Sequence, residues 1–232
     1  MTNYHLLYKE ILKKESGQEI KPTLLLHCCC APCSSYCLEE LVEVFDVTLY
    51  FYNPNITSQT EYNLRLDELK KLNNLVYDGK LNLISENYDS NEFFNAVKGL
   101  ENLGEMSKRC YNCYFLRLEK TAKTAKEKGF NYFATTLSIS PYKSAKYLNE
   151  IGEILSNKYQ IKYLYADFKK EGGYYKSIEL SKKYELYRQD YCGCVYSKNE
   201  REKSKTHWFS MRFVFVKFIV IRYFQLLLYF AC

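Results

Sequence analysis

The sequence predicts an α/β fold, with a parallel, doubly wound β-sheet flanked by helices and a helical C-terminal part. Short apolar runs alternate with longer segments of helical spacing, which is typical of successive βαβ units. The run at 23–28 lacks polar alternation, as expected for a strand buried on both faces. The chain has 232 residues, 47% hydrophobic and 26% charged, which is enough for one sizeable core.

The first elements follow from spacing and capping signals. Residues 4–20 have the spacing of a short amphipathic helix or arm, and the apolar strand at 23–28 comes next. Helical spacing returns over 34–45, where Ser34 or Ser35 is the candidate N-cap.

The middle of the chain continues the alternation. The run VTLYFY at 47–52 predicts a second strand, which an Asn-Pro-Asn turn closes. A polar helix is expected at 58–74, a third strand at 81–86 and a short helix at 90–98. Each strand thus ends before a helical segment, as parallel pairing requires.

The last alternating segments begin with a long helix at 107–128, and Gly129 stands where a helix C-cap belongs. A fourth strand is expected at 130–137, a helix at 143–157 and a fifth strand at 161–166. The chain from there to about residue 202 is expected to be mostly helical.

We expect one catalytic domain over 1–202 and an atypical apolar, basic tail over 203–232. The longest uncharged stretch of the tail is the ten residues from Tyr223, whereas a membrane-spanning helix needs roughly 18. An out-of-frame or foreign C-terminus is favoured over membrane association or an interfacial helix. Apart from this tail, no membrane contact is expected.

Charge and cysteine content narrow the function. The net charge is +6, but residues 1–202 carry only +1, which excludes a generally basic nucleic-acid binder. The N-terminus shows no secretory signal, so a cytoplasmic location is expected. Ten cysteines in such a chain indicate metal or redox chemistry rather than structural disulfides.

Two cysteine groups have the spacing of a metal centre. Cys29 and Cys30 follow the first strand, at the sheet edge where α/β proteins bind ligands. Cys110 and Cys113 form a Cys-x-x-Cys pair near a helix start, which favours thiolates. Four such ligands suit an iron–sulfur cluster, which we favour, or structural zinc; buried core cysteines are the third alternative.

The other cysteines have different predicted roles. Cys192-Gly193-Cys194 has the spacing of a strained, redox-active disulfide, although both thiols could instead be ligands. If the first strand continues to Cys28, that side chain and Cys29 point to opposite faces of the sheet. Cys33 either supports the site or binds a second metal. Cys37 is expected in the core, as is His27.

Nucleotide sites are not expected. The loop after the first strand, CCCAPCSSY, has no glycine, whereas ATP-using proteins of this architecture hold pyrophosphate on a Ser/Gly-rich loop there. The sequence contains neither GxGxxG nor GxxxxGK[ST]. We therefore expect no ATP or NAD site.

The motifs HCCCAPCSSYCLEEL, FYNPNI, EYNLRLDELKKL, RCYNCYFLRLEKTAKTAKEKGFNYFATTLSISPYKS and RQDYCGCVYS together resemble the epoxyqueuosine reductase QueH family. The resemblance covers roughly residues 20–200. It implies a HUP-like fold, as in adenine nucleotide α-hydrolases, used without ATP. It also implies a cobalamin-independent oxidoreductase that converts epoxyqueuosine at the tRNA wobble position to queuosine, the last step of queuosine biosynthesis.

The resemblance also implies roles for individual residues. The 4Fe-4S ligands fall on Cys29, Cys30, Cys110 and Cys113, and the redox-active disulfide falls on Cys192 and Cys194. An additional iron is implied near Cys33, where family members can carry an acidic residue. An external electron donor would re-reduce the disulfide. The rival functions are a zinc-stabilised RNA-binding module without catalysis and an iron–sulfur tRNA thiolation enzyme.

Further candidates complete the expected site. Removing an epoxide oxygen as water needs a proton source, for which Tyr191, Asp190 and Tyr111 are candidates. The anticodon loop needs phosphate contacts. The candidates for these contacts are Arg109, Lys143 and Lys146.

Overall fold

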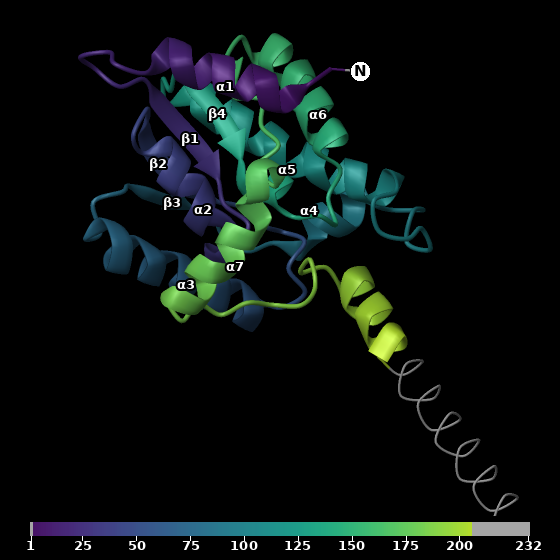
Figure 1. Ribbon diagram of the computed structural model, residues 1–232. Coiled ribbons are helices and arrows are strands. Elements are labelled where there is room, and N and C mark those ends of the chain that lie inside the picture. The colour runs from purple at the N-terminus through teal and green to yellow at the C-terminus, as the bar shows by residue number, and fades with distance from the viewer. Residues whose placement is uncertain (1, 206–232) are drawn as a thin grey trace, which may run out of the picture. The chain divides into compact units, whose positions relative to one another are not determined.

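The structure, a computed structural model, describes residues 2–205 and has the predicted α/β architecture (Figure 1). Five strands form one all-parallel sheet in the order β3-β2-β1-β4-β5. The strands are β1 (Thr23–His27), β2 (Asp46–Phe51), β3 (Leu83–Ser85), β4 (Tyr132–Thr135) and β5 (Lys162–Tyr163). The helices are α1 (Tyr4–Glu15), α2 (Ala31–Leu41), α3 (Gln59–Tyr77), α4 (Ser90–Ala96), α5 (Lys108–Glu127), η1 (Thr136–Ile139), α6 (Ala145–Tyr159), η2 (Lys170–Gly172) and α7 (Gly173–Lys183). Together with a helical segment over 195–205, they confirm the predicted fold class.

The strand order reverses between β1 and β4. The chain adds β2 and β3 on one side of β1, and then crosses to add β4 and β5 on the other. In open parallel sheets, ligands bind outside the carboxyl ends of the strands at such a reversal. His27 is in register with both Tyr50 and Thr135, so the carboxyl ends of β1, β2 and β4 meet at one edge. The cysteine loop after β1 and the turn η1 after β4 both begin at this edge.

Each face of the sheet has its own apolar layer. Leu24 and Leu26 of β1 pack into one layer, with side chains from α2, α3 and α7. Leu25, between them, points to the other layer, with side chains from α5 and α6. The apolar run of β1 is therefore buried on both sides, as its lack of alternation predicted.

Helix α2 begins earlier than predicted. Cys30 is its N-cap, with extended φ and ψ of −172° and 163°, and a proline occupies the first turn. Proline is favoured there because the first helical N–H groups have no intrahelical partner. Ser34 and Ser35 are therefore not N-caps. Instead, Ser34 Oγ donates to Cys30 O at 2.9 Å, and Ser35 Oγ donates to Pro32 O at 3.0 Å.

The end of α5 agrees with its prediction. Gly129 has a φ of +75°, a left-handed conformation that favours glycine. The Phe130 N–H then donates to Ala125 O at 2.9 Å and closes the last turn. Strand β4 follows at once, which delivers η1 to the carboxyl edge.

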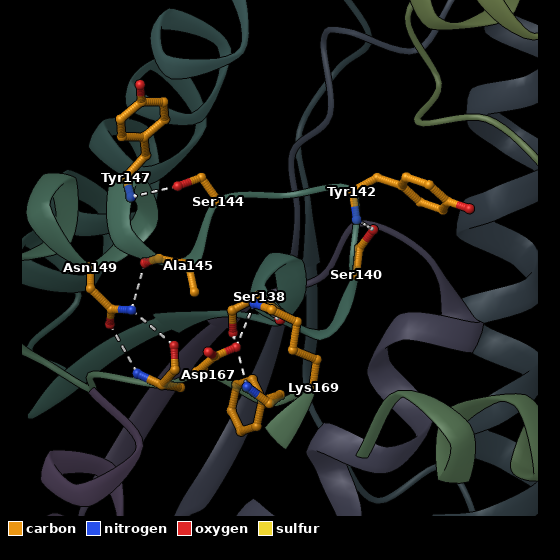
Figure 2. Close-up of polar contacts among 11 residues, drawn as sticks. Ser138, Ser140, Tyr142, Ser144, Ala145, Tyr147, Asn149, Asp167 and Lys169 are labelled. Carbon is orange, nitrogen blue, oxygen red and sulfur yellow. Dashed lines mark hydrogen bonds and ion pairs between the residues drawn. The ribbon is translucent and has the colours of Figure 1, made fainter. Parts of the chain in front are cut away.

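Asn149 of α6 holds the segment after β5 in place (Figure 2). Its Nδ2 donates to Ala145 O at 2.7 Å and to Ala166 O at 3.0 Å. Its Oδ1 accepts from the Ala166 N–H at 3.0 Å. The Asn149 side chain is fully buried, so water cannot take over its hydrogen bonds to these backbone groups.

Replacing Asn149 with alanine should lower the free energy of unfolding by about 2–4 kcal/mol, because it leaves buried backbone groups of Ala166 without partners. Urea unfolding monitored by circular dichroism measures this change. Asn157→Ala, at an exposed position of the same helix, is the matched control and should stay within about 0.5 kcal/mol of the parent chain. Equal losses in both variants would contradict the assigned role.

The described residues fall into two compact units, with a boundary between Gln189 and Asp190. The predicted boundary at residue 202 stays a prediction, because most of the tail, residues 206–232, lies outside the described residues. Among residues 2–205, no helix combines the length and apolarity of a membrane span.

Candidate active site

Three cysteine sulfurs converge just after β1. The Sγ atoms of Cys29, Cys30 and Cys33 all lie within 4.8 Å of one another, and those of Cys29 and Cys30 are 3.8 Å apart. The chain makes this group locally, because Cys30 caps α2 and Cys33 lies in its first turn. All three are free thiols, and Cys29 and Cys30 are buried. The group can hold a thiophilic metal ion.

The three sulfurs do not ionise alike. Hydrogen bonds from Cys29 and Cys33 hold the pKa of Cys30 well below its usual range, and the positive charge of Arg65 acts in the same direction. The pKa of Cys33 is raised well above its usual value, because its hydrogen bonds favour the thiolates of Cys29 and Cys30, and because its partial burial disfavours its own thiolate. Cys30 is therefore the first of the three to become a thiolate, the form that binds metal.

Cys28 and Cys37 are core residues. Cys28 packs in the layer of Leu24 and Leu26, whereas Cys29 packs in the opposite layer, as predicted. Burial raises the pKa of Cys28 to about 12, and its thiol donates to Leu26 O at 3.3 Å. Cys37 is fully buried in the same layer, and burial raises its pKa well above the usual value. Both remain thiols, which agrees with the expected core role of Cys37.

Cys110 and Cys113 lie in the first two turns of α5. Cys113 is buried. Cys110 is partly exposed and packs against the apolar layer that contains Cys29 and Cys30. A four-cysteine set of Cys29, Cys30, Cys110 and Cys113 stays a prediction.

Two arginines are buried beneath this edge. Arg65 of α3 is 2% exposed, and its Nε donates to Glu61 Oε1 at 2.7 Å. Arg117 of α5 is 1% exposed; its Nη1 donates to Asn53 Oδ1 at 3.3 Å. Arg65 is thus already paired with a carboxylate, and its positive charge also favours the thiolate form of Cys30.

The His27 side chain, at the end of β1, hydrogen-bonds to residues at the ends of the two neighbouring strands, β2 and β4. Its Nε2 lies 3.1 Å from Tyr52 O and its Nδ1 lies 2.9 Å from Thr135 Oγ1. A carbonyl only accepts, so Nε2 carries the proton and Nδ1 accepts from the Thr135 hydroxyl. Burial and the positive charge of Arg117 lower the pKa of His27 to about 4, which leaves the ring neutral. Both ring nitrogens are hydrogen-bonded, which supports the prediction that His27 is a core residue rather than a metal ligand.

The Cys-Gly-Cys segment belongs to the second unit, described here by itself. Gly193 has a φ of +124°, which a residue with a Cβ rarely adopts. Cys194 precedes the helix over 195–205, and its Sγ accepts from the Ser197 N–H at 3.4 Å. An N-cap acceptor bonds the helix in this way, and the helix N-terminus favours a thiolate over a thiol.

The candidate proton sources and phosphate contacts differ in their environments. Asp190 forms an ion pair with Lys205 at 2.5 Å, which lowers the pKa of the Asp190 carboxyl and disfavours it as a proton donor. The Tyr111 ring packs edge-on against Tyr147. Tyr191 is partly buried.

The candidate phosphate contacts are not equally accessible. Arg109 is buried and donates to Glu101 O at 3.0 Å, so it is not a surface charge. Lys143 is buried. Lys146 is exposed, and its Nζ lies 3.7 Å from the Glu150 carboxylate.

Sequence reasoning missed several residues around the cysteines. Arg65 and Arg117 stand in helices that also carry exposed charged residues, such as Lys70 and Lys123, so the sequence does not indicate which charged side chains are buried. Asn53 was read only as part of a turn, yet its Nδ2 donates to Cys28 O at 2.9 Å. Thr136 was read as a strand residue, but it begins η1 beside Cys29.

Comparisons with known proteins show which family the chain resembles. The family model described as Epoxyqueuosine reductase QueH matches residues 24–200. The proteins named Epoxyqueuosine reductase QueH from Streptococcus pyogenes and Staphylococcus epidermidis are 40% and 38% identical to the chain. Each alignment covers 84% of the chain, and 78% and 84% of these relatives. The protein of the same name from Thermotoga maritima is 39% identical over 78% of the chain and 93% of its own length.

Proposed function

The chain belongs to the epoxyqueuosine reductase QueH family, and we propose that it is an oxidoreductase that converts epoxyqueuosine in tRNA to queuosine without cobalamin. The match over residues 24–200 carries this proposal. It spans the cysteine group after β1, the Cys-x-x-Cys pair of α5 and the Cys-Gly-Cys segment. The reaction is the last step of queuosine formation.

The reaction removes one oxygen atom from the substrate. Two electrons enter the epoxide carbons, both C–O bonds break, and a C=C bond forms. The oxygen leaves as water after taking two protons. A dithiol supplies two electrons and two protons as it closes to a disulfide, so one Cys192/Cys194 pair balances one turnover. An external reductant then returns the disulfide to the dithiol.

The residues at the first-strand edge suit a 4Fe-4S cluster. Their donors are thiols, the group that iron–sulfur clusters require. The positive charge of the buried Arg65, which favours the thiolate form of Cys30, would also favour the negative charge of such a cluster. Cys29, Cys30, Cys110 and Cys113 are the proposed ligands, and a bound cluster would supply single electrons. Cys33 lies within 4.8 Å of two proposed ligand sulfurs, which makes it the proposed ligand of an additional iron.

The second unit supports a separate role for Cys194. Its sulfur accepts the Ser197 N–H at a helix N-terminus, an arrangement that stabilises a thiolate. The Cys192 backbone N–H donates to Ser197 Oγ at 3.0 Å, so Ser197 contacts both cysteines of the pair. We assign Cys194 as the more nucleophilic thiol and Cys192 as its disulfide partner.

Anaerobic purification followed by iron and sulfide analysis tests the cofactor. Incubation with tRNA that carries epoxyqueuosine and a chemical reductant, without cobalamin, then tests the reaction. Mass spectrometry of the digested nucleosides should show queuosine replacing its epoxide. Substrate that stays unchanged with iron-loaded protein would refute the reductase.

The same measurements separate the rival functions. A zinc-stabilised RNA-binding module would contain zinc, would be colourless and would leave the nucleoside unchanged. An iron–sulfur thiolation enzyme would yield a nucleoside that gains sulfur and would require ATP.

A further inference from the structure

Thr136 contacts a proposed ligand cysteine twice. It is the first residue of η1, directly after β4, and its side chain is fully buried. Its Oγ1 lies 3.4 Å from the backbone nitrogen of Cys29 and 3.6 Å from Cys29 Sγ. One hydroxyl therefore bridges the main chain and the sulfur of the same cysteine, across the reversal between β1 and β4.

The direction of both hydrogen bonds follows from proton counting. The Cys29 N–H can only donate, so Thr136 Oγ1 accepts it. The hydroxyl keeps one proton of its own to donate. A cysteine that ligates metal is a thiolate, which has no proton and can only accept. The Thr136 O–H therefore donates to Cys29 Sγ, and the N–H bond to the same oxygen polarises that hydroxyl and strengthens its donation.

Burial strengthens the hydrogen bond between Thr136 and the Cys29 sulfur. Cys29 is 8% exposed and Thr136 is fully buried, so water does not compete for the sulfur. A hydrogen bond to an ionised acceptor is about twice as strong as a neutral one. The neighbouring residue fixes the turn: Thr135 Oγ1 accepts the Leu137 N–H at 3.2 Å and bonds to His27 at 2.9 Å. The position of the Thr136 hydroxyl is thus set by the strand ends themselves.

We propose that Thr136 is a positioning residue, whose hydroxyl donates to the Cys29 sulfur and thereby raises the reduction potential of the metal centre. The inference rests on the proposed iron–sulfur cofactor. Reduction increases the negative charge on the ligand sulfurs, so a hydrogen bond to one of them stabilises the reduced state more than the oxidised state. Without this bond, the centre is harder to reduce.

The test is a redox titration of the iron-loaded protein, followed by visible absorbance and electron paramagnetic resonance. Thr136→Val keeps the branched shape but lacks the hydroxyl. It should reduce the equilibrium constant for one-electron reduction about tenfold, which lowers the midpoint potential by about 59 mV. Thr136→Ser retains the hydroxyl and should stay close to the parent chain. Thr136→Ala gives the same readout if the valine variant does not fold.

Thr121→Val is the matched control. Thr121 is also fully buried, but its hydroxyl donates to Arg117 O within α5 at 2.7 Å. Its removal should leave the potential unchanged. An unchanged potential in iron-loaded Thr136→Val, or an equal shift in Thr121→Val, would overturn the inference alone. A parent chain without iron would instead refute the cofactor, and this inference with it.

Discussion

Replacing Cys110 with alanine is expected to remove the iron, the brown colour and the epoxide reduction together. A thiolate ligand cannot be replaced by a methyl group, and the other three proposed ligands, Cys29, Cys30 and Cys113, are buried. Loss of an outer partner of a metal ligand already costs about 10–100-fold, so loss of a ligand should lower activity by more than about 100-fold. Iron and sulfide content, absorbance and nucleoside analysis measure the effect. Full iron and normal turnover in Cys110→Ala would refute the ligand assignment.

Two further variants separate a ligand from a merely buried cysteine. Cys37→Ala removes a fully buried thiol of the opposite layer, and should keep iron and activity. Cys33→Ala tests the sulfur that lies close to Cys29 and Cys30 but is absent from the proposed cluster set. It should retain the sulfide content of the parent chain and lose only an additional iron. If Cys33→Ala lost all iron while Cys110→Ala kept it, the ligand set would be Cys29, Cys30 and Cys33.

The sequence was sufficient for the central strands of the sheet, β1, β2 and β4, because these strands are mostly buried. The run Leu24-Leu25-Leu26 within β1 is apolar on both faces of the sheet, and the helices between such runs require parallel pairing. Element ends were harder to predict. The helix after β1 was predicted from Ser34, since serine is a good N-cap, but the proline in its first turn moves the start to Ala31. Strand β5 keeps only Lys162–Tyr163 of the predicted 161–166, because it pairs with β4 alone.

The candidate site was predictable where its residues are neighbours in the chain. Cys29, Cys30 and Cys33 lie at or just before the start of a single helix, so their spacing in the sequence is enough to predict that their sulfurs lie close together. Arg117 and Thr136 could not be predicted in this way. Their contacts depend on how α5 and η1 pack against β1 and β2, over more than 60 residues of sequence. A residue type alone does not indicate such a partner.

Cys194→Ser is expected to keep the iron but to lower multiple-turnover activity by more than about 100-fold. Serine preserves the size of the side chain and can still accept the Ser197 N–H, so the helix start should survive. It cannot form a disulfide, and thus cannot deliver the two electrons that each epoxide needs. Cys192→Ser should have the same effect, since neither thiol closes the bond alone.

The decisive comparison is the double variant. Residues that act as one unit have non-additive effects, so Cys192→Ser combined with Cys194→Ser should be no slower than either single variant. If the two cysteines acted independently, the fold-losses in activity of the single variants would instead multiply in the double variant. Alkylation and mass spectrometry add a direct readout: after turnover without reductant, Cys192 and Cys194 of the parent chain should be protected together by a disulfide. Unimpaired cycling of Cys194→Ser would remove the redox pair from the mechanism, and would leave the metal centre as the remaining source of electrons within the protein.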